Sequence, residues 1–254
     1  LIKTLIMKEN EKVFITGASS GIGAQIAIEY ARRGAILGLA ARREEKLIKI
    51  KQQCLDEGAK EVITYSLDVA DQEKSSRICL EFMNYSEKGI DIIIANAGVA
   101  YSDHLSSGDA TQINQTLITN ILGVTNTILP FIPSMKDTKN GKIVIISSIA
   151  SFTLPAFFGG YAASKVAVRR LADSWRGYLK KYNIQVTTIC PGYIKSEMTD
   201  INEFNMPFLM DTDVAATKMV KAIDNGKKTY ILPWQWRPVI FISNLLGKRL
   251  LSRI

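Results

Sequence analysis

Short apolar segments alternate with amphipathic segments along the whole chain. Seven runs rich in β-branched and aliphatic residues are typical of buried strands: 12–16, 36–41, 61–67, 91–95, 142–146, 184–190 and 229–232. Between them, apolar residues recur every three or four positions, which is typical of helices: 21–33, 44–57, 74–88, 109–135, 161–181 and 212–225. Such alternation predicts an α/β fold of the doubly wound, Rossmann type, with a mainly parallel seven-stranded sheet and helices on both faces.

The composition shows no break and no linker rich in proline or serine. We therefore expect one domain over residues 1–254, with a core at 8–232 and a C-terminal tail at 233–254. Pro130 and Pro133 are expected to end the helix at 109–135. Residues 1–6 are too short, and too soon followed by charges, to be a secretory signal.

The tail predicts a helix that is apolar almost all round between residues 239 and 246. A helix with so broad an apolar surface is expected to be buried, either on its own domain or on a second subunit. An alternative follows from the charges, because residues 235–254 contain Lys and Arg but no acid. In that alternative the tail makes peripheral contact with an anionic membrane surface.

Charge and rare residues narrow the possible chemistry. The net charge of +8 is compatible with an anionic cofactor, a nucleic acid or a membrane surface, but the cations are scattered without interleaved aromatic residues, which disfavours a nucleic-acid partner. The three cysteines are far apart and His104 is the only histidine. This pattern predicts no metal site and fits a reduced, cytoplasmic compartment.

A glycine-rich turn follows the first strand. Gly17, Gly21 and Gly23 form the spacing G-x-x-x-G-x-G between that strand and the next helix. Glycines let the backbone approach a phosphate, and the free amides at a helix N-terminus attract the anion. The arrangement predicts a dinucleotide-binding site.

The second strand ends without the acid that often binds the ribose hydroxyls of NAD. Ala41 stands there instead, followed by Arg42, a cation that can pair with a 2′-phosphate. We therefore expect a preference for NADP(H) over NAD(H). Asp68 and the Asn96–Gly98 segment follow the next two strands, where a doubly wound sheet has its ligand crevice.

Tyr161 and Lys165 are four residues apart in a predicted helix and so lie on one face, one turn from each other. A neighbouring ammonium favours the phenolate and is expected to lower the pKa of Tyr161. The pair alone is a weak signal, but it predicts a general acid/base near neutral pH when taken with the other motifs.

Together these motifs resemble the short-chain dehydrogenase/reductase family in its single-domain form, over about residues 12–232. Six elements fall in family order: the Thr16–Gly23 turn, Asp68, Asn96-Ala97-Gly98, Asn120, Ser148 with Tyr161 and Lys165, and Pro191-Gly192. The sequence departs from the family pattern at two positions. Ala95 replaces a common Asn, which is not expected to remove activity, and Ser196 replaces a common Thr but keeps the hydroxyl.

The resemblance implies roles for individual residues. Tyr161 would exchange a proton with the substrate oxygen, Ser148 would hydrogen-bond that oxygen, Lys165 would hold the nicotinamide ribose, and Asn120 would keep a water in a proton relay. The remaining implied cofactor-binding residues are Gly17, Ser19, Ser20, Ile22, Gly23, Arg42, Asp68, Val69, Asn96, Gly98, Pro191, Gly192, Ile194 and Ser196.

The implied function is an oxidoreductase that transfers a hydride between NADP(H) and a carbonyl/secondary-alcohol substrate. Apolar segments at 152–158 and 198–210 favour a lipophilic substrate. A 3-oxoacyl-thioester reductase of fatty-acid synthesis shares every motif and is an alternative. A nucleotide-binding sensor without catalysis is a second alternative, disfavoured because Tyr161 and Lys165 are both present. The resemblance also implies a homodimer or homotetramer.

Overall fold

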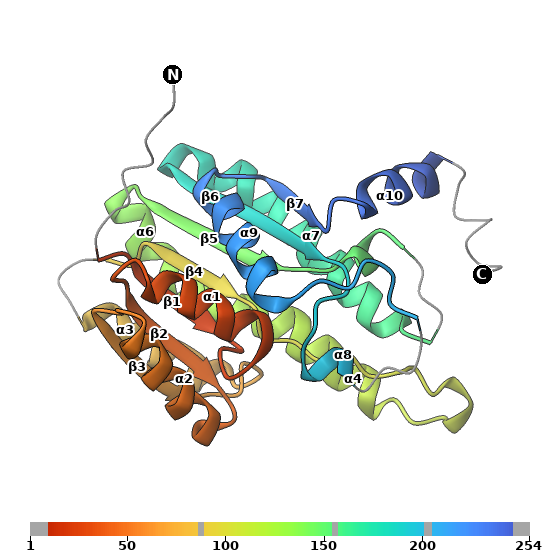
Figure 1. Ribbon diagram of the computed structural model, residues 1–254, viewed down its shortest axis with the longest axis horizontal. Helices are drawn as coiled ribbons and strands as arrows, with labels where there is room; N and C mark the ends of the chain where they lie inside the picture. The colour runs from red at the N-terminus through yellow and green to blue at the C-terminus, as the bar shows by residue number, and fades with distance from the viewer. Residues whose placement is uncertain (1–9, 86–88, 154–156, 201–204, 246–254) are drawn as a thin grey trace.

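A seven-stranded sheet forms the centre of the chain, and all of its strands run parallel (Figure 1). The computed structural model describes residues 10–85, 89–153, 157–200 and 205–245. The strands are β1 (Lys12–Thr16), β2 (Ile36–Ala41), β3 (Glu61–Ser66), β4 (Ile92–Ala95), β5 (Gly141–Ile146), β6 (Ile184–Pro191) and β7 (Thr229–Leu232). The predicted α/β fold and all seven strands are confirmed, with boundaries that differ by one residue at most.

The strand order is β3-β2-β1-β4-β5-β6-β7. The chain starts at β1, builds outward to β3, and then returns to the other side of β1 with β4. This reversal opens a crevice beyond the carboxyl ends of β1 and β4, where ligands bind in such sheets.

Helices cover both faces of the sheet, as predicted. One buried cluster packs α1 (Gly21–Ala31), α2 (Glu44–Asp56) and α9 (Thr212–Asp224) against the sheet. The opposite cluster contains α3 (Gln72–Asn84), α5 (Gly123–Ile128), α6 (Ile132–Thr138) and α7 (Gly159–Leu179). The five inner strands, β1, β2, β4, β5 and β6, are buried on both faces, which explains why they appear in the sequence as nearly continuous apolar runs.

The predicted helix at 109–135 does not end at its prolines. It runs from α4 (Thr111–Leu117) through a π turn at Ile118–Leu122, α5 and a 3₁₀ turn at Leu129–Phe131 to the end of α6. Pro130 and Pro133 each lie in the first two positions of a new helical segment, where the missing N–H costs little. Thr111–Thr138 has the length and hydropathy of a membrane-spanning helix, but its side chains at Val124, Ile128 and Phe131 pack in the core of this domain.

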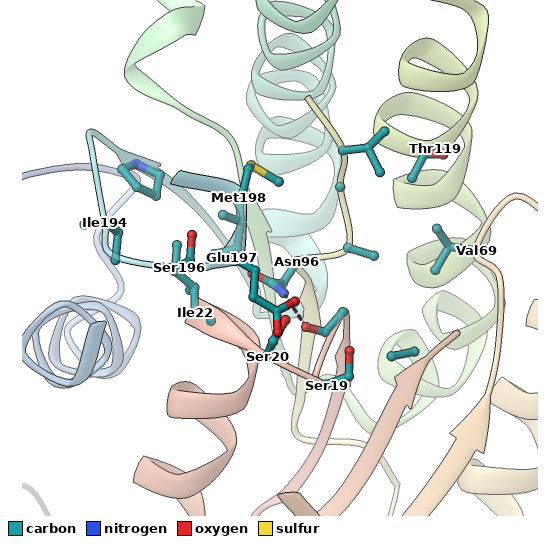
Figure 2. A pocket seen from close by; sticks show the side chains of 18 of the residues that line it. Ser19, Ser20, Ile22, Val69, Asn96, Thr119, Ile194, Ser196, Glu197 and Met198 are labelled. Atoms are coloured by element: carbon teal, nitrogen blue, oxygen red, sulfur yellow. Dashed lines mark hydrogen bonds between the residues drawn. The ribbon is translucent and has the colours of Figure 1, made fainter. Parts of the chain in front are cut away.

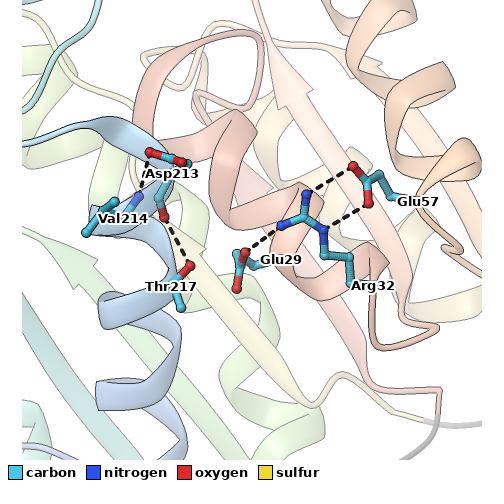
Figure 3. Close-up of polar contacts among 6 residues, drawn as sticks. All are labelled: Glu29, Arg32, Glu57, Asp213, Val214 and Thr217. Carbon is cyan, nitrogen blue, oxygen red and sulfur yellow. Dashed lines mark hydrogen bonds and ion pairs between the residues drawn. The ribbon is translucent and has the colours of Figure 1, made fainter.

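Polar contacts at the surface orient the helices on the first face (Figure 3). Arg32 follows α1 and joins Glu29 at 2.8 Å and Glu57, just after α2, at 2.9 Å. Asp213 lies in the first turn of α9, and its carboxylate accepts from the N–H of Val214. These pairs are exposed, so we assign them a role in orientation and little stabilising free energy.

The tail forms α10 (Trp236–Leu245), which projects from the body of the domain (Figure 1). Ile240 is buried, but Val239, Phe241 and Ile242 are 41%, 67% and 52% exposed. The described part of this helix is therefore not buried on its own domain, and its burial on a second subunit stays a prediction. Residue 246 and the cations that follow it lie outside the described residues.

Candidate active site

A cleft opens at the carboxyl ends of the central strands and brings together residues that are far apart in the sequence (Figure 2). Sixteen of the predicted site residues line it: Gly17, Ser19, Ser20, Ile22, Arg42, Asp68, Val69, Asn96, Gly98, Ser148, Tyr161, Lys165, Pro191, Gly192, Ile194 and Ser196. Gly23 and Asn120 lie behind this lining rather than in it. Lining residues that the sequence did not single out include Arg43, Thr119, Glu197 and Met198.

The glycine turn is shaped for close backbone approach. Gly17 and Gly21 have φ of +66° and +55°, which favour glycine. A Cβ on Gly23 would lie 2.4 Å from the carbonyl oxygen of Gly17, so Gly23 lets α1 pack onto the turn. Ser20 is the N-cap of α1 but makes no side-chain capping bond, so its hydroxyl does not occupy the first amides of this helix. These features fit the pyrophosphate of a dinucleotide.

Asn96 braces this turn from the end of β4. Its amide nitrogen donates to the carbonyl oxygens of Thr16 at 3.0 Å and Gly17 at 3.1 Å. Its backbone N–H donates to the Thr16 hydroxyl at 3.2 Å. Asn96, which is predicted to contact the cofactor, thus also ties the end of β4 to the end of β1 across the crevice.

Ser148, Tyr161 and Lys165 converge in the cleft. Ser148 follows β5, while Tyr161 and Lys165 lie one turn apart in α7. Ser148 and Tyr161 are hydrogen-bonded through their side chains. The ammonium of Lys165 donates to the carbonyl oxygen of Ile146 at 3.0 Å and lies 5.6 Å from the centre of the Tyr161 ring.

Burial shifts the pKa values of Tyr161 and Lys165 in opposite directions. It raises the pKa of Tyr161 above its usual value, and the Ser148 hydrogen bond only partly opposes that shift. It also lowers the pKa of Lys165 to about 8. The expected net lowering of the Tyr161 pKa is therefore wrong for this structure, because desolvation of the phenolate outweighs the favourable interactions. The result keeps Tyr161 protonated at neutral pH.

Asn120 lies in the π turn and is fully buried. Its amide nitrogen donates to the carbonyl of Val99 at 2.9 Å and to the Ser164 hydroxyl at 3.0 Å, and its oxygen accepts from the Val99 N–H at 2.9 Å. Both amide hydrogens are used, so a water near Lys165 could bind only to an oxygen of Asn120. A Cβ on Gly98 would meet this amide oxygen at 3.1 Å and the Lys165 ammonium at 3.4 Å, which places Asn120 beside Lys165.

Two cations, Arg42 and Arg43, line the cleft near the end of β2, where the sequence predicted one. Arg42 is half-exposed and lies 4.0 Å from Asp68. Arg43, which the sequence did not single out, donates to the hydroxyls of Ser20 at 2.8 Å and Ser19 at 3.3 Å. Arg43 also pairs with Glu197, which is 154 residues away in the sequence. No local pattern could have indicated that pair.

The comparisons agree with this architecture. A model of the short chain dehydrogenase family matches residues 11–205, and the chain belongs to this family of oxidoreductases. An uncharacterized oxidoreductase of Myxococcus xanthus is 34% identical over 221 residues, which span 87% of each chain. The 11-beta-hydroxysteroid dehydrogenase 1A of Arabidopsis thaliana is 31% identical over 271 residues, covering 99% of this chain and 77% of that protein.

Solved structures show the same fold. An alcohol dehydrogenase from Thermococcus sibiricus, complexed with 5-hydroxy-NADP, is 26% identical with a TM-score of 0.77, covering 88% of this chain and 95% of that one. A short chain dehydrogenase/reductase from Burkholderia phymatum, in complex with NAD, has a TM-score of 0.83 over 91% and 92% of the two chains. At 22% identity, the latter supports the fold alone.

Proposed function

We propose that this protein is an NADP(H)-dependent oxidoreductase that interconverts a carbonyl compound and a secondary alcohol. The observation that carries the proposal is the convergence of Ser148, Tyr161 and Lys165 in the cleft beside the glycine turn. The nicotinamide supplies the hydride chemistry when it is bound, and the protein positions the substrate and moves the proton. The complex of a similar fold with 5-hydroxy-NADP supports a nicotinamide dinucleotide cofactor.

In the proposed mechanism, protonated Tyr161 donates to the carbonyl oxygen during reduction. The pKa of Tyr161 is raised from an ordinary value that is already well above neutral, so the phenol carries this proton at neutral pH. Ser148 donates a hydrogen bond to the same oxygen, and Lys165 holds the nicotinamide ribose and supports proton return to Tyr161. Asn120 fixes the Val99 segment beside Lys165, and the predicted water relay would use its oxygen.

The preference for NADP(H) is supported by the charge at the end of β2. No carboxylate stands at Ala41, while Arg42, Arg43 and the Ser20 hydroxyl line the neighbouring part of the cleft. A guanidinium and a hydroxyl suit a 2′-phosphate. We expect Arg43→Ala to weaken NADPH binding roughly ten- to hundredfold, more than Arg42→Ala does, because charged hydrogen bonds contribute roughly 1.5–3 kcal/mol.

Fluorescence titration of both variants with NADPH and NADH measures the four affinities and tests this prediction. NADH affinity is expected to change about twofold or less, since NADH has no 2′-phosphate. Equal loss for both cofactors would contradict the assignment. Wild-type protein that binds both cofactors equally would contradict the preference itself.

The proposed substrate is lipophilic. Val99 and Met198 line the cleft, and Met198, Phe157 and Phe208 leave 41%, 76% and 46% of their surface exposed. The steroid named for the Arabidopsis thaliana relative belongs to this chemical class. Purified protein with NADPH should reduce apolar ketones, such as steroid ketones, faster than sugars. Activity confined to 3-oxoacyl thioesters would identify the alternative, and activity on polyhydroxylated compounds alone would contradict the lipophilic assignment.

We also propose a homo-oligomer, a dimer or tetramer, in the cytoplasm. Exposed apolar side chains on the helical stretch 111–138 and on α7 support this assembly. Their exposed fractions are 43% for Ile118, 50% for Leu122, 51% for Leu129 and 37% for Val166. A second copy would remove this surface from water.

The face of α10 is proposed to contact an anionic lipid surface instead. Its exposed side chains are apolar, Arg237 lies beside them, and residues 225–254 contain six cations and no acid. A second copy placed on the same face would bring like charges together, whereas anionic headgroups complement them.

A further inference from the structure

An ion pair crosses the cleft at the end that is expected to hold the adenosine of the cofactor. Glu197, in the four-residue helix α8 (Glu197–Asp200), accepts from Arg43 at 2.6 Å, and its other carboxylate oxygen accepts from Lys46. Arg43 immediately precedes α2 and Lys46 lies in it, so the contact joins the two halves of the sheet. We call these three residues the Glu197 bridge.

The bridge occupies cationic atoms that the proposed 2′-phosphate site needs. The Arg43 guanidinium that binds Glu197 also donates to the hydroxyls of Ser20 and Ser19. A hydroxyl that accepts from Arg43 still has its own hydrogen to donate to an anion. The Arg43 guanidinium is therefore shared between the Glu197 carboxylate and the two hydroxyls that are expected to face a 2′-phosphate.

The Glu197 carboxylate and a 2′-phosphate are both anions, so they compete for the same cations. Hydrogen bonds from Lys46 and Arg43 lower the pKa of Glu197 to about 2, so it stays anionic at physiological pH. A phosphate monoester carries roughly −1.5 to −2 charges at pH 7, and placing it beside a carboxylate is unfavourable. Glu197 is 49% exposed, which leaves room for its side chain to move into solvent.

We propose that Glu197 is an internal competitor of the 2′-phosphate and sets the discrimination between NADP(H) and NAD(H). This inference rests on the proposed NADP(H) site. Binding of a 2′-phosphate transfers Arg43 and Lys46 from the carboxylate to the phosphate and opens the bridge. A nucleotide without that phosphate leaves the bridge closed.

Opening the bridge has a consequence at the other end of the cleft. Ser196 and Met198 flank Glu197 in sequence and line the same cleft. Thr199 ties this turn together, because its hydroxyl accepts from the Ser196 N–H at 2.8 Å and donates to the Ile194 carbonyl at 3.0 Å. These bonds hold residues 194–199 together as one turn. Release of Glu197 removes the tie between this turn and α2, so Ser196 and Met198, which are expected to lie near the nicotinamide and the substrate, can move with it.

The test compares Glu197→Gln with wild type by calorimetric titration of two probes. Adenosine 2′,5′-bisphosphate carries the 2′-phosphate, and adenosine 5′-monophosphate lacks it. The variant should bind the bisphosphate about two- to tenfold more tightly, because exposed ion pairs typically contribute 0.2–1 kcal/mol and removal of the repulsion adds to this. Affinity for the monophosphate should stay within about twofold, and the gain should shrink at high salt.

Asp200→Asn is the matched control, since it removes the same charge three residues away on α8. An equal gain in this control would show a general charge effect and overturn the proposal. Weaker binding of both probes by Glu197→Gln would show that the bridge holds the cleft together, which also overturns it.

The two proposals fail separately. Wild type that binds both probes equally contradicts the NADP(H) site, yet a preference for the bisphosphate that appears in Glu197→Gln would still support Glu197 as the competitor. Wild type that prefers the bisphosphate, with an unchanged ratio in the variant, contradicts only the role of Glu197. Thermal unfolding of each variant establishes that it is folded.

Discussion

At the scale of single residues, the cleft depends on two groups, Tyr161 and Lys165, whose pKa values are shifted in opposite directions. Burial disfavours the charged forms of both Tyr161 and Lys165, so it raises one pKa and lowers the other. The spacing in the sequence correctly placed these side chains together but could not indicate how deeply they are buried. Their protonation states therefore follow from packing.

Replacing Tyr161 with Phe removes the transferable proton and little volume. We expect turnover to fall roughly 10²–10⁴-fold, the range typical of a general acid/base, with NADPH affinity nearly intact. Steady-state kinetics and a cofactor titration measure the two quantities. Unchanged turnover would rule out Tyr161 as the proton donor and would favour a nucleotide-binding role without catalysis.

Lys165 predicts a pH dependence of stability. Its pKa of about 8 in the folded protein is below the value near 10.4 of an unfolded chain, so the unfolded state binds more protons between these values. Stability contributed by this group therefore rises with pH across that window. Relative to Lys165→Met, wild type should gain on the order of 1–3 kcal/mol of unfolding free energy between pH 7 and 10. Urea unfolding at several pH values tests this, and a difference that does not change with pH would contradict the buried, shifted lysine.

At the scale of elements, strands were easier to predict than helix ends. The apolar runs identified all seven strands, and they are clearest in the central strands, which are buried on both faces. The long helical stretch was misjudged at Pro130 and Pro133, since a proline can begin a new helical segment as well as end one. The short helix α8 was missed, because four residues carry no periodicity.

The π turn at Ile118–Leu122 begins and ends with exposed apolar side chains, Ile118 and Leu122. If a second copy covers this face, Leu122→Glu should shift the protein toward monomer, because a carboxylate is costly to bury at an apolar contact. Sedimentation velocity measures the mass distribution. Leu80→Glu on α3 is the control, since Leu80 is similarly exposed at 52%. An oligomer that survives Leu122→Glu would place the interface elsewhere.

At the scale of the whole molecule, the topology explains which parts of the site the sequence could indicate. Residues at the carboxyl ends of parallel strands share one edge of the sheet, so the glycine turn, Asn96, Ser148 and the Pro191-Gly192 pair were expected to meet. The contact between Arg43 and Glu197 joins opposite halves of the sheet through two loops. Loop conformation is not set by periodicity, so this contact became visible only in three dimensions.

The arrangement of α10 connects this cleft to the proposed membrane surface. Trp236 contacts the rings of Tyr193 and Phe208, and a Cβ on Gly192 would lie 2.5 Å from its indole nitrogen. The helix is thus anchored next to the cleft while Phe241 and Ile242 point into solvent. A lipophilic substrate dissolved in a membrane would then lie close to the cleft.

We expect Phe241→Ser with Ile242→Ser to reduce sedimentation with phosphatidylcholine vesicles that contain about 30 mol% phosphatidylserine, because binding scales with buried apolar area and charge attraction. The oligomeric mass and activity on a water-soluble ketone should not change, since both side chains are exposed and Trp236 is retained. Ile48→Ser with Leu80→Ser is the matched control, because it removes two apolar side chains of similar exposure, 57% and 52%, from α2 and α3. Equal loss of vesicle binding in the control, or no binding by wild type, would eliminate the membrane contact. A smaller oligomeric mass in the α10 variant would instead identify a second copy as the group that covers this face.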